Sequence, residues 1–251
     1  MTDSLEITPE YYDLIVNWDR RLAREGPFYR RLFDDLGARR VLDAACGTAR
    51  HLILFAGQGL ACTGSDADPT MVEAARANAA AAGVGIDFFV APFADLPGRV
   101  GEPFDVVLCV GNGFSMVPDQ EAAASAVGLA SAVRPGGALV LHVLNADRFA
   151  EREPVFMPLG VREKDGRTVL FQKIFEPRAD GLGVHFILIE EQPDGSWQRG
   201  VRSNVIASRG LDAYRALLSD AGFTALDVFG DYQRGPLSPD SDDLIIVARK
   251  G

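Results

Sequence analysis

Between residues 41 and 144, short apolar runs alternate with helical segments, and this alternation constrains the fold more than any other feature. Such runs are typical of strands because they are short and bounded by segments with helical spacing. Continuously apolar strands suit a sheet covered on both faces, and strands that alternate with helices pair in parallel. The expected strands are Val41–Ala44, Leu60–Ser65, Ile86–Val90, Phe104–Val110 and Ala138–Leu144.

Helical segments fill the spaces between these strands, and a further helical stretch precedes the first. Over residues 10–36, apolar side chains recur with rough helical spacing, and Pro9 and Pro27 stand where helices can begin. Pro69–Ala82 is rich in alanine and carries its proline in the first turn. The other expected helices are Thr48–Ala56 and Gln120–Val133.

After residue 150 the pattern changes to that of antiparallel strands. Asp-Gly dipeptides at 165–166, 180–181 and 194–195 separate apolar runs, and this dipeptide is a strong hairpin signal. The expected hairpin strands are Phe156–Val161, Thr168–Glu176, Gly183–Glu191 and Trp197–Ala207. A helix at Asp212–Ala221 and two strands, near Ala225–Gly230 and Asp243–Ala248, are expected to complete the chain.

Together these patterns predict an α/β fold with a doubly wound, mostly parallel seven-stranded sheet and an inserted antiparallel β hairpin block. Residues 1–153 and 209–251 form one expected domain with an N-terminal helical cap, and residues 154–208 form the insertion. The insertion is a candidate lid, substrate platform or dimer interface, so a homodimer is considered. Ligands of such sheets bind at the carboxyl ends of the strands, and the loops there are the expected site.

The charge balance argues against one class of partner. The formal net charge is −10, and an acidic chain repels nucleic acid phosphates unless it carries a basic patch. The arginine-dense stretch at 20–40 is interrupted by acids, and a solvated helix face explains it better. We therefore expect no nucleic acid partner.

Cysteine and histidine usage points to a cytoplasmic protein without a structural metal. No cysteine belongs to a CxxC pair, and each lies in or beside an apolar run, as reduced core cysteines do. No signal peptide and no apolar run of bilayer-spanning length is visible, so no membrane partner is expected. The cysteines are Cys46, Cys62 and Cys109; the histidines, which lack metal-ligand spacing, are His51, His142 and His185.

Two strand ends carry acids in positions that suit a ligand. In Val41–Ala49 a strand ends, turns through small residues and opens a helix, so a ligand can approach the backbone, although an ordinary strand–helix turn has the same pattern. Asp66 follows Gly47 by 19 residues and is suited to bind a ribose diol. Its alternative role is a helix N-cap, for which Asp68 is better placed. The absence of GxGxxG disfavours a nicotinamide cofactor.

Two further loops follow the third and fourth strands. Phe93, in Ala91–Pro97, is expected either against an adenine face or in the core. In Cys109–Phe114, glycines flank Asn112, which is a candidate contact for a polar group of the substrate. A turn with asparagine in the left-handed conformation is the alternative.

In their order, these four segments resemble those of class I S-adenosylmethionine (SAM) dependent methyltransferases. Within that class they are similar to the glycine/sarcosine N-methyltransferase-like small-molecule enzymes. The resemblance covers about residues 10–150 and the general layout of the rest, and it implies a Rossmann-like fold, SAM as cofactor and a small-molecule acceptor. The matching segments are Val41–Ala49, Asp66–Asp68 with Met71, Phe104–Phe114 and Val133–Gly137.

The resemblance also implies cofactor-binding roles. The turn from Ala45 to Gly47 would bracket the methionine part of SAM. Asp66, with Ala67 beside it, would bind the ribose hydroxyls. The remaining implied contacts are Met71 on the adenine, the Phe93 amide at the adenine edge, the Val110 carbonyl on the ammonium, and Tyr12 with a nearby arginine, for which Arg24 is the candidate, closing over the cofactor. Met116 and Phe114 are candidate walls of the methyl-transfer site, and core packing is their alternative.

Three positions depart from the family pattern. Ala49 stands where a third glycine is usual, and its small side chain is expected to leave binding intact. Pro92 replaces an acid or amide that contacts the adenine amine. Leu144 occupies the place of an arginine for the substrate carboxylate, which makes a small amino acid an unexpected substrate.

Catalysis requires an acceptor held in line with the methyl–sulfur bond, because the sulfonium is already activated. His142 is the candidate base for an O-nucleophile, its alternative being a hydrogen-bonded core histidine. His185, Arg202 and Tyr232 are further candidates for the pocket; the alternative is solvent for His185 and a surface role for Arg202 and Tyr232. The leading hypothesis is N- or O-methylation of a small molecule; the alternatives are methylation of a protein or nucleic acid, and a non-catalytic SAM-binding or scaffold protein.

Overall fold

The computed structural model describes residues 5–149 and 153–251. The chain divides into two compact units, which are described separately. One unit comprises residues 19–148 and 209–251, and the other comprises the residues up to Trp18 together with Phe149–Ser208. The N-terminal segment groups with the antiparallel strands, whereas the predicted boundary placed it with the parallel sheet.

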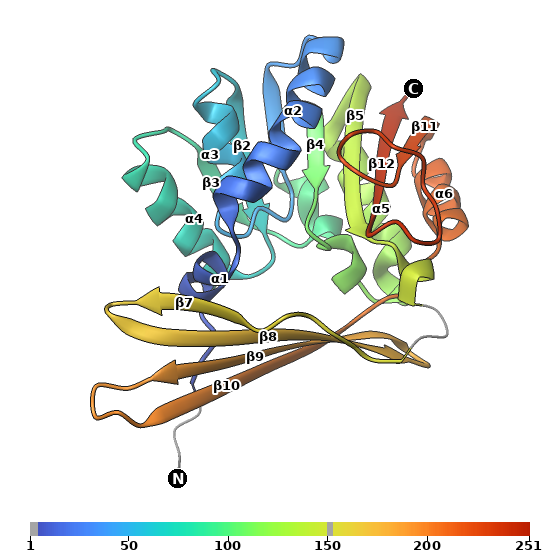
Figure 1. Cartoon of the computed structure of the whole chain (residues 1–251). Coiled ribbons are helices and arrows are strands. Elements are labelled where there is room, and N and C mark those ends of the chain that lie inside the picture. The colour runs from blue at the N-terminus through green and yellow to red at the C-terminus, as the bar shows by residue number, and fades with distance from the viewer. Residues whose placement is uncertain (1–4, 150–152) are drawn as a thin grey trace. The chain divides into compact units, whose positions relative to one another are not determined.

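The larger unit is built on a seven-stranded sheet with the order β11-β12-β5-β4-β1-β2-β3 (Figure 1). The five neighbouring strands β3, β2, β1, β4 and β5 pair in parallel, while β12 pairs antiparallel with both β5 and β11. The predicted α/β class and mostly parallel sheet are confirmed. The strands are β1 (Arg40–Asp43), β2 (Ala61–Asp66), β3 (Asp87–Val90), β4 (Phe104–Cys109), β5 (Val133–Leu144), β11 (Phe223–Phe229) and β12 (Asp243–Lys250).

Helices cover both faces of this sheet, as expected for strands with apolar residues on both sides. On one face Leu129 and Tyr214 pack with strand residues such as Val107. On the other, Tyr29 and Phe55 pack with a set that includes Val106. The helices are α2 (Trp18–Leu36), α3 (Arg50–Ala56), α4 (Pro69–Ala81), α5 (Asp119–Ala132) and α6 (Leu211–Asp220), with short 3-10 turns η1 (Phe93–Gly98), η2 (Phe114–Met116) and η3 (Ala146–Phe149).

The smaller unit contains an antiparallel sheet with the order β10-β9-β8-β6, and β7 also pairs with β8. The Asp165-Gly166 turn between β7 and β8 has positive φ at both residues, as a tight two-residue hairpin turn requires. Val169 and Leu188 pack with Tyr11 of α1 (Pro9–Ile15). The strands are β6 (Val155–Phe156), β7 (Gly160–Lys164), β8 (Arg167–Arg178), β9 (Gly181–Glu191) and β10 (Trp197–Ile206).

Three expected elements differ from the observed ones. The helix over 10–36 is interrupted at Val16, which has extended backbone angles, and Pro27 lies inside α2 rather than at a helix start. Buried side chains on both sides of Pro27 hold α2 together despite the missing N–H. The expected strand Phe156–Val161 is two short strands, and β5 begins at Val133 rather than at Ala138.

Candidate active site

The turn between β1 and α3 is held by hydrogen bonds from strands beside it. The Ala44 amide donates to the Leu108 carbonyl at 2.8 Å, and the Cys46 amide donates to the Ser65 carbonyl at 2.9 Å. Gly47 and Ala49 then adopt left-handed φ values of 50° and 65°. Nothing would contact a Cβ added at Gly47, so the turn presents open backbone at the carboxyl edge of the sheet.

Asp66 ends β2 and ties this turn to the next one. Its Oδ2 accepts a hydrogen bond from the Gly47 amide at 2.9 Å, and its Oδ1 accepts one from the Asp68 amide at 3.0 Å. Burial raises the pKa of Asp66, while the amides of Asp68 and Gly47 act in the opposite direction. Asp68, not Asp66, caps α4, because its carboxylate accepts from the Thr70 amide at 2.8 Å. The alternative N-cap role for Asp66 is therefore wrong.

A second acid, Asp43, lies at the end of β1 and is 1% exposed. Burial raises its pKa to about 7, although a backbone hydrogen bond from Ala45 opposes the change. Asp66 raises the pKa of Asp43 further. Two carboxylates whose ionised forms are disfavoured thus flank this turn, and a cation bound beside them would stabilise their charges.

The turn after β4 is fastened to β5. Gly111 and Asn112 have φ values of 71° and 76°. The Gly111 amide donates to His142 Nδ1 at 3.2 Å, and Asn112 Oδ1 accepts from the Leu144 amide at 2.6 Å. The amide side chain of Asn112 thus serves the turn role expected as the alternative to a substrate contact. A Cβ added at Gly113 would come 2.6 Å from Ala45 Cβ, so the turns after β1 and β4 approach closely there.

His142 is buried, and both of its ring nitrogens have partners. Nδ1 faces the Gly111 amide, and Nε2 lies 3.0 Å from Asp243 Oδ1. This geometry matches the hydrogen-bonded core histidine weighed against the base. Neither nitrogen is in position to take a proton from an acceptor without giving up a contact.

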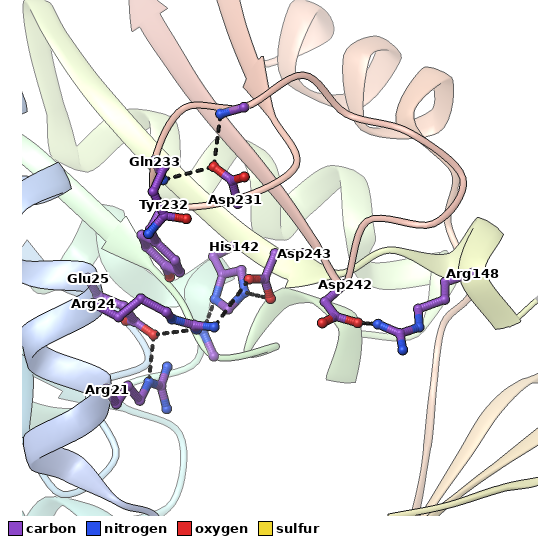
Figure 2. A network of polar contacts seen from close by, with 12 residues as sticks. Arg21, Arg24, Glu25, His142, Arg148, Asp231, Tyr232, Gln233, Asp242 and Asp243 are labelled. Atoms are coloured by element: carbon purple, nitrogen blue, oxygen red, sulfur yellow. Dashed lines mark hydrogen bonds and ion pairs between the residues drawn. The ribbon is translucent and has the colours of Figure 1, made fainter.

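A polar network of α2 faces the same region (Figure 2). Glu25 is fully buried and accepts hydrogen bonds from Arg21 Nε at 3.0 Å and Arg24 Nη2 at 3.1 Å, and its Oε2 lies 2.8 Å from His51 Nε2. Burial raises the pKa of Glu25, but the hydrogen bond from His51 and the charge of Arg21 lower it more, to about 2. Arg24 also lies over the ring of Tyr232, with Cζ 5.3 Å from the ring centroid.

The prediction of a solvated helix face for residues 20–40 is wrong at Glu25, because this side chain is buried. The sequence carried a signal for it: Glu25 stands four residues after Arg21 and four before Tyr29, which places it on the apolar stripe of the helix. Asp243 lies 101 residues from His142 along the chain, and nothing local in the sequence predicts their contact.

The other predicted cofactor residues are placed as follows. Phe93 stacks on Phe114 with ring centroids 6.0 Å apart and packs against the core. Met71 is half-buried in α4, whereas Met116 is 47% exposed. The remaining ones are the half-buried Ala45 and Tyr12, the exposed Ala67 and Arg24, and the buried Val110.

Tyr12 belongs to the smaller unit, and its ring contacts Trp18 edge-on with centroids 5.9 Å apart. Its closure over the cofactor stays a prediction. In the same unit His185 Nδ1 lies 2.8 Å from Ser203 Oγ and Nε2 lies 3.2 Å from Glu176 Oε2, while Arg202 is exposed. Tyr232, in the larger unit, is buried, and its hydroxyl lies 3.3 Å from that of Tyr29.

Comparison with known proteins agrees with this geometry. Residues 41–137 match the family model described as a methyltransferase domain. Glycine/sarcosine N-methyltransferase of Parasynechococcus marenigrum (strain WH8102) is 27% identical over 238 residues, covering 94% of this chain and 81% of the relative.

Two solved structures share the fold at identities that support no finer likeness. DesVI of Streptomyces venezuelae has a TM-score of 0.81 at 18% identity and covers 98% of this chain and 100% of its own. SAM-bound CalS10, an amino pentose methyltransferase of Micromonospora echinaspora, has a TM-score of 0.74 at 20% identity, with 100% of both chains covered.

These matches identify residues 41–137 as a methyltransferase domain, and the chain has the fold of class I SAM-dependent methyltransferases. Within that class its sequence is similar to that of glycine/sarcosine N-methyltransferases. The residues present fit SAM as cofactor: Gly47 offers open backbone, and the raised pKa values of Asp43 and Asp66 suit a cationic ligand with hydroxyls.

Two classes of feature are absent from the described parts of the chain. Neither 5–149 nor 153–251 contains a helix that is long and apolar enough to cross a bilayer. Across those same ranges, no group of three or more His, Cys, Asp or Glu side chains is arranged to hold a metal ion.

Proposed function

We propose that this enzyme transfers the SAM methyl group to a nitrogen or oxygen of a small molecule by in-line SN2 displacement. The observation that carries the proposal is the extent of the likeness to glycine/sarcosine N-methyltransferase. It spans 94% of this chain, and therefore the antiparallel strands as well as the methyltransferase domain at 41–137.

In the proposed complex, the residues of the larger unit hold the cofactor. Asp66 accepts hydrogen bonds from the ribose hydroxyls, and Gly47 leaves room for the methionine part above its backbone. Asp43 supplies negative charge beneath the turn. The other proposed contacts are Ala45, Ala67, Met71, the amide of Phe93, the carbonyl of Val110, Met116 and Arg24.

The sulfonium of SAM supplies an activated methyl group, so the protein's task is to position the acceptor and exclude water. Such positioning contributes on the order of 7–11 kcal/mol. His142 and Asn112 use their polar atoms to hold the β4 turn. An acceptor that needs no base, such as a neutral amine, fits this arrangement better than a phenol.

We infer that the acceptor amine carries no carboxylate at the subsite beside Leu144. Leu144 is apolar, whereas an enzyme that acts on a small amino acid is expected to have an arginine there to bind the substrate carboxylate. The likeness to CalS10, an amino pentose methyltransferase, makes amino sugars the first class to test.

The test is transfer of labelled methyl from SAM to a panel of amino sugars, amino acids and phenols. We expect turnover with an amino sugar and little with glycine or sarcosine. Asp66→Ala serves as the cofactor-deficient control. Turnover of glycine, or of a phenol only, would contradict the proposed acceptor, and labelling of protein or nucleic acid would favour those alternatives. SAM binding without any turnover would favour a non-catalytic protein.

A homodimer is the assembly we propose. The alternation of side chains along each strand and the strand register place several exposed apolar side chains on one face of the antiparallel sheet. We propose that a second copy of the chain covers this face. Light scattering after size exclusion tests this, with Val201→Lys expected to give monomers, and a monomeric wild type would contradict it. The exposed residues are Phe156, Val161, Trp197, Val201 and Val205.

A further inference from the structure

The backbone conformation of the turn after β4 needs contacts from outside the turn to stabilise it. Gly111 and Asn112 are consecutive residues in the left-handed region, with φ values of 71° and 76°. Asparagine tolerates this region better than most residues, but a non-glycine residue there persists only when its surroundings impose it. The question is which groups impose it.

Three hydrogen bonds fasten this turn to the end of β5. The Gly111 amide donates to the imidazole Nδ1 of His142 at 3.2 Å, and the Asn112 amide donates to the His142 carbonyl at 3.2 Å. Asn112 Oδ1 accepts from the Leu144 amide at 2.6 Å. His142 therefore contacts the turn through both its backbone and its side chain.

The partners of the imidazole select one tautomer. Nδ1 faces an amide donor and must offer its lone pair, so the proton lies on Nε2 and is donated to Asp243. Asp243 is placed by register: it pairs with Leu144, and Ile245, two residues on, pairs with His142. Burial raises the pKa of Asp243, but the hydrogen bond from His142 and the charge of Arg24 lower it below its usual value.

A second set of contacts links Asp243 to α2 (Figure 2). Arg24 Nη1 lies 3.8 Å from Asp243 Oδ2, and Arg24 Nη2 lies 3.1 Å from Glu25 Oε1. Glu25 in turn accepts from Arg21, whose Nη2 would lie 3.3 Å from a Cβ at Gly111. These contacts link the Gly111 amide through His142, Asp243, Arg24 and Glu25 to Arg21, and we call these residues the Gly111 network.

We propose that His142 is a positioning residue, whose Nδ1 holds the Val110–Asn112 turn in the form that binds the amino acid end of SAM while Asp243 orients the imidazole. The inference rests on the proposed function in one respect, the contact between the Val110 carbonyl and the SAM ammonium. It replaces the role of general base for His142, because both imidazole nitrogens have partners within the Gly111 network.

Two isosteric variants separate these roles. Asparagine places a carbonyl oxygen where His142 has Nδ1, so His142→Asn keeps the acceptor for the Gly111 amide and loses the donor to Asp243. Glutamine places its amide near the position of Nε2, so His142→Gln keeps the donor and loses the acceptor. A general base would be lost in both.

Titration calorimetry with S-adenosylhomocysteine is the first measurement. We expect His142→Gln to bind it about tenfold more weakly, which is the effect of one lost hydrogen bond. His142→Asn should stay within about threefold of the wild type. Matching far-ultraviolet circular dichroism and melting curves establish that both variants fold. Wild-type affinity in His142→Gln, or equal losses in both, would overturn the proposal.

Two measurements need no ligand. In the folded wild type, nitrogen-15 spectra of labelled histidine should show the proton of His142 on Nε2. The Gly111 amide should exchange with solvent about tenfold more slowly in the wild type and His142→Asn than in His142→Gln. A proton on Nδ1 or an unprotected Gly111 amide would overturn the proposal. Failure of the wild type to bind S-adenosylhomocysteine would instead count against the proposed function.

Discussion

The two turns that follow β1 and β4 have similar backbones and opposite electrostatics. Each contains two left-handed residues, Gly47 and Ala49 in the first, Gly111 and Asn112 in the second. Beside the first turn, burial raises the pKa values of Asp43 and Asp66. Beside the second, the acids Glu25 and Asp243 have lowered pKa values because arginine and histidine side chains face them.

This difference indicates that the two turns have different roles at the same edge of the sheet. The chain uses its own cations to neutralise the acids near the second turn. The acids at the first turn accept hydrogen bonds from backbone amides, which satisfy oxygens but bring no net positive charge. A sulfonium ligand would complete the first turn, whereas the second is complete within the chain.

Removing Glu25, an ion-paired acid near the second turn, should have the largest effect. Glu25→Ala leaves Arg21, Arg24 and His51 without their shared buried carboxylate, and we expect unfolding free energy to fall by about 3–5 kcal/mol. Chemical denaturation measures this. The control is Glu102→Ala, which removes an exposed ion pair with Arg40 and should cost less than about 1 kcal/mol. A small loss in Glu25→Ala would show that the network does not hold α2.

The pH dependence of the same group has a defined sign. The folded pKa of Glu25, about 2, lies below its ordinary value of 4.5, so its contribution to stability is complete above about pH 4.5. The contribution is lost as the pH falls toward 2. Acid titration of unfolding should show a shallower fall in Glu25→Gln than in the wild type, and identical slopes would contradict this.

At the first turn, Asp66→Ala should lower SAM affinity by about 100-fold. The change removes a carboxylate from the proposed ribose site and the hydrogen-bond acceptor of the Gly47 amide. Calorimetry with SAM measures the loss. Asp68→Ala is the matched control: it removes the cap of α4, with about 1 kcal/mol of stability, and leaves affinity nearly unchanged. Equal affinity in the wild type and Asp66→Ala would remove this assignment.

Asp43 should make the first turn sensitive to pH. Its folded pKa of about 7 lies above the ordinary 3.8, so the folded chain binds the proton more tightly. Stability of the free protein should fall as the pH rises from about 4 to 7, and SAM affinity should rise over pH 6 to 8 as the charge appears. Asp43→Asn should flatten both profiles, and an unchanged profile in that variant would assign the titration to another group.

The smallest expected effect concerns Ala49, which has a φ of 65° and precedes α3. A left-handed alanine costs about 1 kcal/mol, and glycine adopts this conformation without a steric penalty. Ala49→Gly should therefore raise the unfolding free energy by up to about 1 kcal/mol and leave SAM affinity unchanged. Gly83→Ala, at a φ of 69° beyond α4, is the opposite control and should destabilise by a similar amount.

Much of the architecture was predictable from local patterns. Strand ends, and with them Gly47, Asp66 and Asn112, followed from apolar runs bounded by turn residues. The N-cap role of Asp68 followed from its spacing before Pro69. The same reasoning placed Pro27 at a helix start and treated residues 20–40 as solvated, because a helix pattern alone does not show which partner covers each turn.

The sequence by itself determined the order of helices and strands, the sheet class and the acids that end β1 and β2, because these depend on periodicities spanning a few neighbouring residues. Only the tertiary structure decided that His142 contacts the β4 turn through Nδ1 while Asp243 faces its Nε2, and that Glu25 is buried among charged partners. Those contacts depend on the register between β5 and β12 and on the face α2 presents. Both are set by packing between segments up to 101 residues apart.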